Sequence, residues 1–229
     1  MIPFKDNIPT RTLPVVTIAI IVLNCVAHVY QQFLPMDDSV ALVQLLGVVP
    51  ARVTDIPSWF FPGLRNPAVS LVGSMFMHGG WLHLGGNMLY LWIFGNNVED
   101  AMGHLRFIAF YLLCGIAAAV AQVIAQPGSL IPMIGASGAV SGILGAYLIL
   151  HPFARVQTLF IIIFFIRVIE LPAIIVLGVW FLLQIMNSLS APAGAAGVAW
   201  NAHIGGFIVG LALIRFFQSR KSSRRGGWR

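Results

Sequence analysis

Long apolar runs, separated by short connections rich in proline, glycine and charge, make up most of the chain. A helix rises about 1.5 Å per residue, so about 20 apolar residues cross the ~30 Å hydrocarbon core of a bilayer. Such runs lie at 14–34, 82–101, 105–125, 136–150, 171–190 and 198–218. The pattern predicts an all-α polytopic membrane protein, with a compact six-transmembrane-helix bundle in one domain (1–218) and a basic cytoplasmic tail at 219–229.

Three segments depart from the length of a full span. The run 136–150 reaches only about 22 Å as a helix, so we expect a short fourth helix that begins below the outer surface. The stretch Val156–Ile166 reaches about 17 Å and is expected to lie at the interface or to lead into the fifth span. The first connection, 35–68, contains neighbouring aromatic residues and is expected to be a loop partly inserted at the headgroup level.

Composition supports a membrane protein and excludes a soluble domain with a polar surface. The chain is 59% apolar and 9% charged, with a mean hydropathy of +0.90. Both cysteines lie inside apolar runs, where small buried thiols are expected rather than a disulfide or a metal site.

The distribution of Lys and Arg predicts the orientation. With both termini in the cytoplasm, only Arg52 and Arg65 fall on the outer side. We therefore expect the plasma or inner membrane, with polar groups near the outer ends of the helices open to the extracytoplasmic side. The basic tail is expected to meet anionic lipid, and nucleic acid is disfavoured because the patch is short and juxtamembrane.

Polar side chains recur in three of the runs at positions that would bring them together. His83 and Asn87 stand four residues apart near the outer end of the second run, so they share a helix face. Ser137 would begin the sunken fourth helix, and His203 would lie roughly 9 Å inside the sixth. Because these three helices run in the same direction, the four side chains are expected at a similar depth.

This convergence is typical of nucleophilic acyl transfer, which needs a hydroxyl, a base and donors for an oxyanion. At a helix N-terminus, Ser137 has free backbone N–H groups and the positive end of the helix dipole beside it. No carboxylate joins Ser137 and His203, so the pattern predicts a Ser–His dyad. Ser141 is expected to donate back to a carbonyl of the preceding turn. Close approach of the fourth and sixth helices is expected at Gly138, Gly142, Gly206 and Gly210.

Three motifs carry a family resemblance: HGGWLHLGGN in the second run, GASG in the fourth and AHIGG in the sixth. Together, in this order, they resemble the rhomboid family of intramembrane serine proteases across all six runs. The resemblance implies that Ser137 is the nucleophile and His203 its general base. It implies cleavage of other membrane proteins in or near a transmembrane segment, without metal, ATP or organic cofactor. The oxyanion and supporting set that it implies is His83, Asn87, Ala136 and His78.

The chain departs from the family pattern at two places. Ser141 stands where many bacterial members carry an aromatic residue that packs on the catalytic histidine, so the orientation of His203 must depend on other neighbours. A Trp-Arg pair of the first loop is also missing.

Two other functions stay open. A small transporter or channel would use buried histidines as proton relays, but it leaves the GASG helix start unexplained and no acidic pair marks an ion path. A non-catalytic binding relative would tolerate the motifs without requiring them. Of the remaining histidines, His28 and His104 are expected at the interface. The substrate and the oligomeric state are not encoded in any legible pattern.

Overall fold

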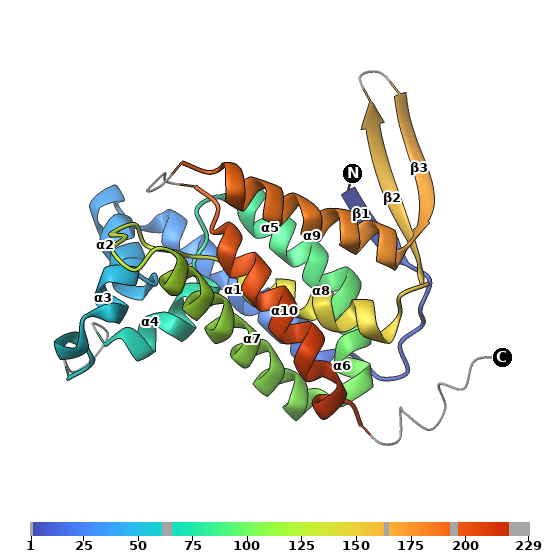
Figure 1. Ribbon diagram of the computed structural model, residues 1–229, viewed down its shortest axis with the longest axis horizontal. Helices are drawn as coiled ribbons and strands as arrows, with labels where there is room; N and C mark the ends of the chain where they lie inside the picture. The colour runs from blue at the N-terminus through green and yellow to red at the C-terminus, as the bar shows by residue number, and fades with distance from the viewer. Residues whose placement is uncertain (1, 61–65, 163–164, 193–196, 220–229) are drawn as a thin grey trace.

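The computed structural model describes residues 2–60, 66–162, 165–192 and 197–219 and is mainly helical (Figure 1). The helices are α1 (Val15–Phe33), α2 (Met36–Leu46), α3 (Pro50–Thr54), α4 (Pro67–Gly73), α5 (Trp81–Tyr90), α6 (Asn96–Met102), α7 (His104–Ala125), α8 (Ser137–Leu150), α9 (Ala173–Ser190) and α10 (Trp200–Phe217). Shorter turns are η1 (Ile56–Phe60), η3 (Ser74–Phe76) and the π-helical η4 (Leu91–Gly95), and the strands are β1 (Ile2–Asp6), β2 (Arg155–Ile162) and β3 (Phe165–Pro172).

Each of the six apolar runs is helical, with ends within two residues of those predicted. Among the described residues, four helices are long and apolar enough to cross a membrane, namely α1, α7, α9 and α10. The second run is helical from Trp81 to Met102, but η4 divides it into α5 and α6. The fourth run forms α8, which has only 14 residues.

The all-α prediction is wrong between α8 and α9. There β2 and β3 form an antiparallel hairpin, and β1 pairs with the other edge of β2 to give the order β1–β2–β3. Because β-branched and aromatic residues fill 156–169, the segment favours a pleated strand over a helix. Val156–Ile166 therefore does not lead into the fifth helix, which begins at Ala173. Figure 1 shows the hairpin projecting away from the helices.

A carboxylate at the end of β1 ties the sheet to the helices. Asp6 accepts hydrogen bonds from the Asn97 side chain on α6, at 2.8 Å, and from the Tyr147 hydroxyl on α8. Burial raises the pKa of the Asp6 carboxyl above its ordinary value, and the hydrogen bond from Tyr147 partly opposes that shift. The Ser219 N–H donates to the carbonyl of Ala101 at 3.0 Å, so both described ends of the chain meet α6.

The first connection is more ordered than a loop, because α2, α3, η1 and α4 occupy most of it. Residues 61–65 of this connection lie outside the described residues, as does the predicted basic tail from residue 220 onward. Partial insertion of the connection and lipid contact of the tail stay predictions.

The depth of His28 in the membrane stays a prediction, but its side chain packs inside the bundle. His28 is fully buried on the inward face of α1, where its ring meets Trp81 edge-on with the centroids 4.8 Å apart. His104, by contrast, begins α7, and its Nδ1 lies 2.6 Å from a carboxylate oxygen of Glu99. Glu99 also accepts hydrogen bonds from the backbone N–H groups of Val16 and Thr17, which have no acceptor within α1 because they lie in its first turn.

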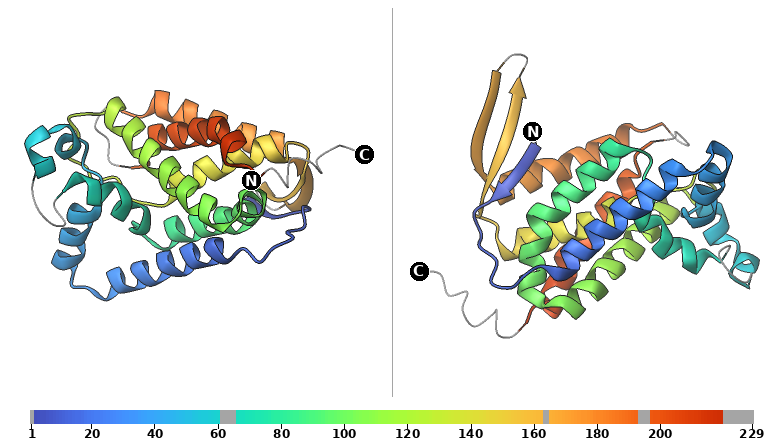
Figure 2. Two further views of the ribbon diagram at one scale, coloured as in Figure 1. Left: turned by 90° about the horizontal axis from the view of Figure 1, so that it is seen from below. Right: turned by 180° about the vertical axis from the view of Figure 1, so that it is seen from behind.

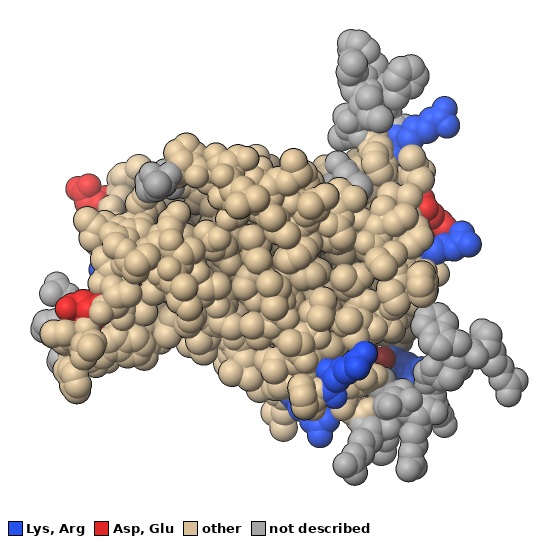
Figure 3. Space-filling model, in the orientation of Figure 1, with Lys and Arg blue, Asp and Glu red and all other residues tan. Residues whose placement is uncertain are grey.

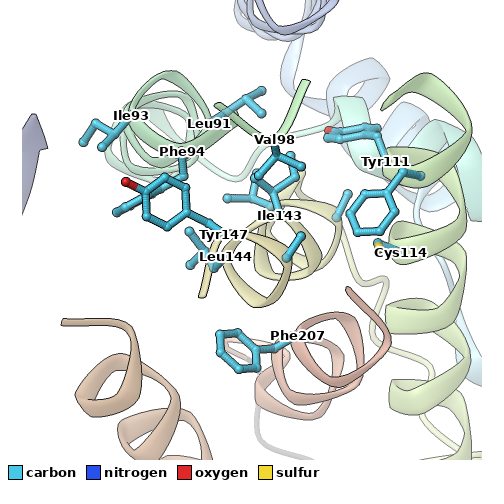
Figure 4. Packing of buried hydrophobic residues seen from close by; sticks show 14 of the residues in the cluster. Leu91, Ile93, Phe94, Val98, Tyr111, Cys114, Ile143, Leu144, Tyr147 and Phe207 are labelled. Atoms are coloured by element: carbon cyan, nitrogen blue, oxygen red, sulfur yellow. The ribbon is translucent and has the colours of Figure 1, made fainter. Parts of the chain in front are cut away.

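The other helices enclose α8, and its residues from Gly138 to Tyr147 are buried (Figure 2). Large side chains fill the space on one side, including Tyr147 and Ile143 of α8 against Phe94 of η4 (Figure 4). On the other side of α8, Gly138, Gly142 and Gly145 face α10. A Cβ added at Gly206 would overlap the carbonyl oxygen of Gly138, and one added at Gly210 would overlap that of Gly142. The two backbones therefore touch, which fixes the distance between their side chains.

Replacing Gly210 by alanine is expected to lower the stability of the bundle by about 1–3 kcal/mol or more, because the methyl group must push α10 away from α8. Gly178→Ala on α9 is the matched control, since a Cβ there meets no atom within 4 Å. That change is expected to leave stability equal or raise it by about 0.5–1 kcal/mol. Thermal unfolding in detergent measures both, and equal melting temperatures for the two variants would contradict the close contact.

Candidate active site

A cavity of about 970 Å³ opens among α5, α8, α9 and the start of α10. Its wall includes Ser137, His203, His83 and Asn87, which come from three different helices. Among the described residues that line it, none is Asp, Glu, Lys or Arg. Chemistry in this cavity therefore depends on neutral groups and on backbone dipoles.

Ser137 is the first residue of α8, and the fully buried Ala136 precedes it at the N-cap. The chain enters this helix through Gly135 at φ +123°, a conformation that residues with a Cβ rarely adopt. The first N–H groups of a helix have no acceptor within it and carry partial positive charge. The Ser137 hydroxyl thus lies beside donors that suit a developing negative charge.

The Oγ of Ser137 lies 2.8 Å from Nε2 of His203 on α10. His203 is buried, with 8% of its surface exposed, and its Nδ1 lies 2.8 Å from Oε1 of Gln184 on α9. Among the described residues no carboxylate forms a hydrogen bond with His203. The contacts link a hydroxyl (Ser137), a proton acceptor (His203) and a partner that orients the acceptor (Gln184) in one hydrogen-bonded chain.

His83 lies on the other side of Ser137. A Cβ added at Gly135 would lie 2.7 Å from Nε2 of His83 and 3.6 Å from Oγ of Ser137, so the ring packs directly against Gly135. The Gly79 N–H donates to Nδ1 of His83 at 3.5 Å, which leaves the ring proton on Nε2. That N–H is thus available on the side of Ser137.

Asn87, in the cavity wall, forms a second pair with His78, which is not among the lining residues. The Asn87 side-chain nitrogen lies 3.0 Å from Nε2 of the fully buried His78, and the Ala136 N–H donates to the same nitrogen at 3.5 Å. Since two donors point at Nε2, this nitrogen is the acceptor. His78 therefore joins Asn87 to the residue before Ser137, and Asn87 keeps one further N–H.

A family model described as "Rhomboid domain" matches residues 65–220, more than half of the 229-residue chain. The chain belongs to the rhomboid family. Rhomboid protein 1, mitochondrial, of Saccharomyces cerevisiae is 31% identical over 152 residues, which cover 62% of this chain and 40% of that protein. Rhomboid-like protease 5 of Toxoplasma gondii is 33% identical over 150 residues (62% and 15%). Rhomboid protease GluP of Bacillus subtilis is 41% identical over 78 residues (34% and 15%). The chain thus spans well under two thirds of the length of these relatives.

Membership of the rhomboid family and the four long apolar helices make this chain an integral membrane protein. The outward face of α9 is apolar, as contact with lipid requires. Its exposed large side chains are Ile174, Ile175, Val179, Leu182, Leu183, Met186 and Leu189, and the exposed polar residues Asn187 and Ser190 lie in its last turn.

In this rhomboid, three neighbours of His203 were missed in the sequence. Besides Gln184, Trp180 and Trp200 flank the imidazole, each with its ring centroid 6.0 Å away. Gln184 could have been recognised in the sequence, since it is the first polar side chain in α9 and polar residues inside apolar spans often have a function. The prediction for Ser141 is confirmed, because its hydroxyl donates to the Ser137 carbonyl at 2.6 Å and does not reach His203.

Replacing Asn87 or His83 by alanine is expected to slow substrate cleavage by up to ~10²–10³, the loss typical of one oxyanion donor. Activity should fall without vanishing, because the backbone donors at the start of α8 remain. The measurement is the cleavage rate of a reporter membrane substrate, with thermal unfolding recorded for each variant. A fully active Asn87→Ala variant, or a loss explained by unfolding alone, would show that these side chains only pack the helices.

Proposed function

We propose that this rhomboid is an intramembrane serine endopeptidase that hydrolyses peptide bonds in or near transmembrane segments of other membrane proteins. The observation that carries the proposal is the 2.8 Å contact between Ser137 Oγ and His203 Nε2, in a cavity whose described lining residues include no Asp, Glu, Lys or Arg. Two of the relatives reported above are named as proteases, which agrees with this activity. The chemistry described next needs neither a metal nor an organic cofactor.

In the first half of the reaction, Ser137 Oγ attacks the carbonyl carbon of the substrate while its proton passes to Nε2 of His203. The resulting oxyanion accepts hydrogen bonds from the backbone N–H of Ser137, from Nε2–H of His83 and from the amide of Asn87. His203 then gives the proton to the leaving nitrogen, the C–N bond breaks, and an acyl-enzyme on Ser137 remains.

In the second half, water replaces the amine. His203 takes a proton from the water, whose oxygen attacks the ester carbon, and the same donors stabilise the second oxyanion. Collapse of this intermediate breaks the C–O bond to Ser137, which regains its proton from His203. The product is a carboxylic acid, and both residues return to their starting protonation states.

The proposal includes a topology of six spans, formed by α1, the α5–α6 segment, α7, a short sunken α8, α9 and α10. On the face shown in Figure 3, charged side chains lie at the left end, along the right edge and on the lower edge right of centre, and the area between them is uncharged. Both described ends of the chain meet α6, so they share one side, which we assign to the cytoplasm of a cell membrane. The cavity then opens toward the extracytoplasmic side.

A reconstituted cleavage assay tests the proposed function. The protein in liposomes is expected to cut a co-reconstituted reporter that carries a transmembrane segment, and mass spectrometry of the fragments gives the cleavage site. Cleavage sites in or near the transmembrane segment support the proposal. Binding of a panel of such reporters without cleavage favours a non-catalytic relative, whereas proton or solute flux without cleavage favours a transporter, and either outcome contradicts the proposal.

A further inference from the structure

Gln184 has its side-chain amide fixed in one orientation. Its nitrogen donates a hydrogen bond to the main-chain carbonyl of Trp180 at 3.0 Å, one turn earlier on α9. Rotating the amide by 180° would set its oxygen against that carbonyl, which places two acceptors face to face. The backbone of α9 therefore directs Oε1 of Gln184 toward α10. Gln184 is also buried, with 6% of its surface exposed.

The fixed amide determines which nitrogen of His203 carries the proton. Because Oε1 of Gln184 can only accept, the Nδ1 that lies 2.8 Å from it must donate. The neutral ring then has an unprotonated Nε2, the nitrogen 2.8 Å from the Ser137 hydroxyl. A continuous chain of donors thus runs from Ser137 through His203 and Gln184 to the Trp180 carbonyl.

We propose that Gln184 is a positioning residue that fixes the Nδ1–H form of His203 and aims Nε2 at Ser137, the part that a carboxylate plays in a Ser–His–Asp triad. This inference rests on the proposed function, since it concerns the base of that reaction. It also answers how His203 is oriented while Ser141 occupies the adjacent position on α8, where its hydroxyl turns back to the Ser137 carbonyl.

A neutral amide suits this place better than a carboxylate would. A buried carboxylate near lipid carries a large desolvation cost, whereas an amide pays much less and still accepts the hydrogen bond. The groups that face His203 are Ser137 of α8, Gln184 and Trp180 of α9, and Trp200 of α10 itself. His83 of α5 is the titratable group that acts on it across the cavity.

Two substitutions and one matched control test the positioning role. Gln184→Met keeps the length of the side chain but removes the amide acceptor, and it is expected to lower kcat by about 10- to 100-fold, the range found when a metal-bound histidine loses the partner that orients it. Gln184→Glu, in the neutral form that burial favours, restores both the acceptor for Nδ1 of His203 and a donor for the Trp180 carbonyl, so it is expected to recover most of that loss.

Ser188→Ala serves as the control, because Ser188 lies one turn further along α9 and donates to the Asn201 side chain of α10 at 2.8 Å. The variant loses a polar contact between the same two helices without touching His203. It is expected to keep the wild-type kcat. A Gln184→Met enzyme with the wild-type rate, or a Gln184→Glu enzyme no faster than Gln184→Met, would overturn the proposal while leaving the proposed function standing.

The tautomer can also be read without catalysis. Nitrogen NMR of protein labelled at histidine is expected to show His203 with a protonated Nδ1 and an unprotonated Nε2, assigned by loss of the signals in His203→Ala. In Gln184→Met the two tautomers should mix, and in Ser188→Ala they should not. A wild-type ring protonated on Nε2 would overturn the proposal even if cleavage is observed. The expected spectra without any cleavage would place the failure in the proposed function instead.

Discussion

Replacing Ser137 by alanine is expected to abolish cleavage of a transmembrane reporter, a loss of roughly 10⁶ where the uncatalysed background allows it to be measured. The reason is geometric, since among the serines that line the cavity Ser137 holds its Oγ against His203, at 2.8 Å from Nε2. The position at the start of α8 also surrounds the hydroxyl with backbone donors. The rate is measured in liposomes at substrate excess, with thermal unfolding recorded beside it.

Ser141→Ala is the matched control for that experiment. Ser141 lies one turn further along α8, lines the same cavity and donates its hydroxyl to the Ser137 carbonyl. Its loss is expected to leave substantial activity, because a back-bond of this kind is local to the helix. Equal loss of activity in both variants, with folding intact, would contradict the assignment of Ser137 as nucleophile.

Replacing His203 by alanine is expected to silence cleavage almost as completely, because a serine hydroxyl is a weak nucleophile without a base to take its proton. Labelling by an active-site probe should fall together with cleavage. His151→Ala, at the opposite end of α8, is the comparison, since it also removes a histidine, in this case a half-buried one, but lies away from the cavity. Undiminished probe labelling in His203→Ala would be incompatible with a dyad.

The helices of this rhomboid were predictable from sequence because lipid imposes a simple rule. A chain in hydrocarbon must satisfy its backbone hydrogen bonds internally, so long apolar runs become helices. The hairpin of β2 and β3 was not predicted, because its residues are as apolar as those of the helices and apolar content alone does not distinguish a strand from a helix. There the deciding factors were β-branched composition and pairing with β1, which lies about 150 residues earlier in the chain. Such distant pairing leaves no local pattern.

The candidate site was predictable to a similar extent. Ser137 and His203 follow from polar residues placed at comparable depth in helices of the same direction, and the structure brings their side chains together. The partnership of Asn87 with His78 was not visible, because it depends on how the chain turns before α5. Gln184 was missed because it belongs to no motif, although a polar residue that follows eleven residues without a polar side chain in α9 was a usable signal.

A fluorophosphonate probe tests the central claim most directly, because it reacts with an activated serine and needs no knowledge of the substrate. The folded wild-type protein in detergent or liposomes is treated with the probe, digested, and the modified peptide is sequenced by mass spectrometry. The account predicts one modified residue, Ser137, and no modification in Ser137→Ala or His203→Ala. Modification of a different serine, persistence of the label in Ser137→Ala, or a folded wild-type protein that is not modified at all would contradict it.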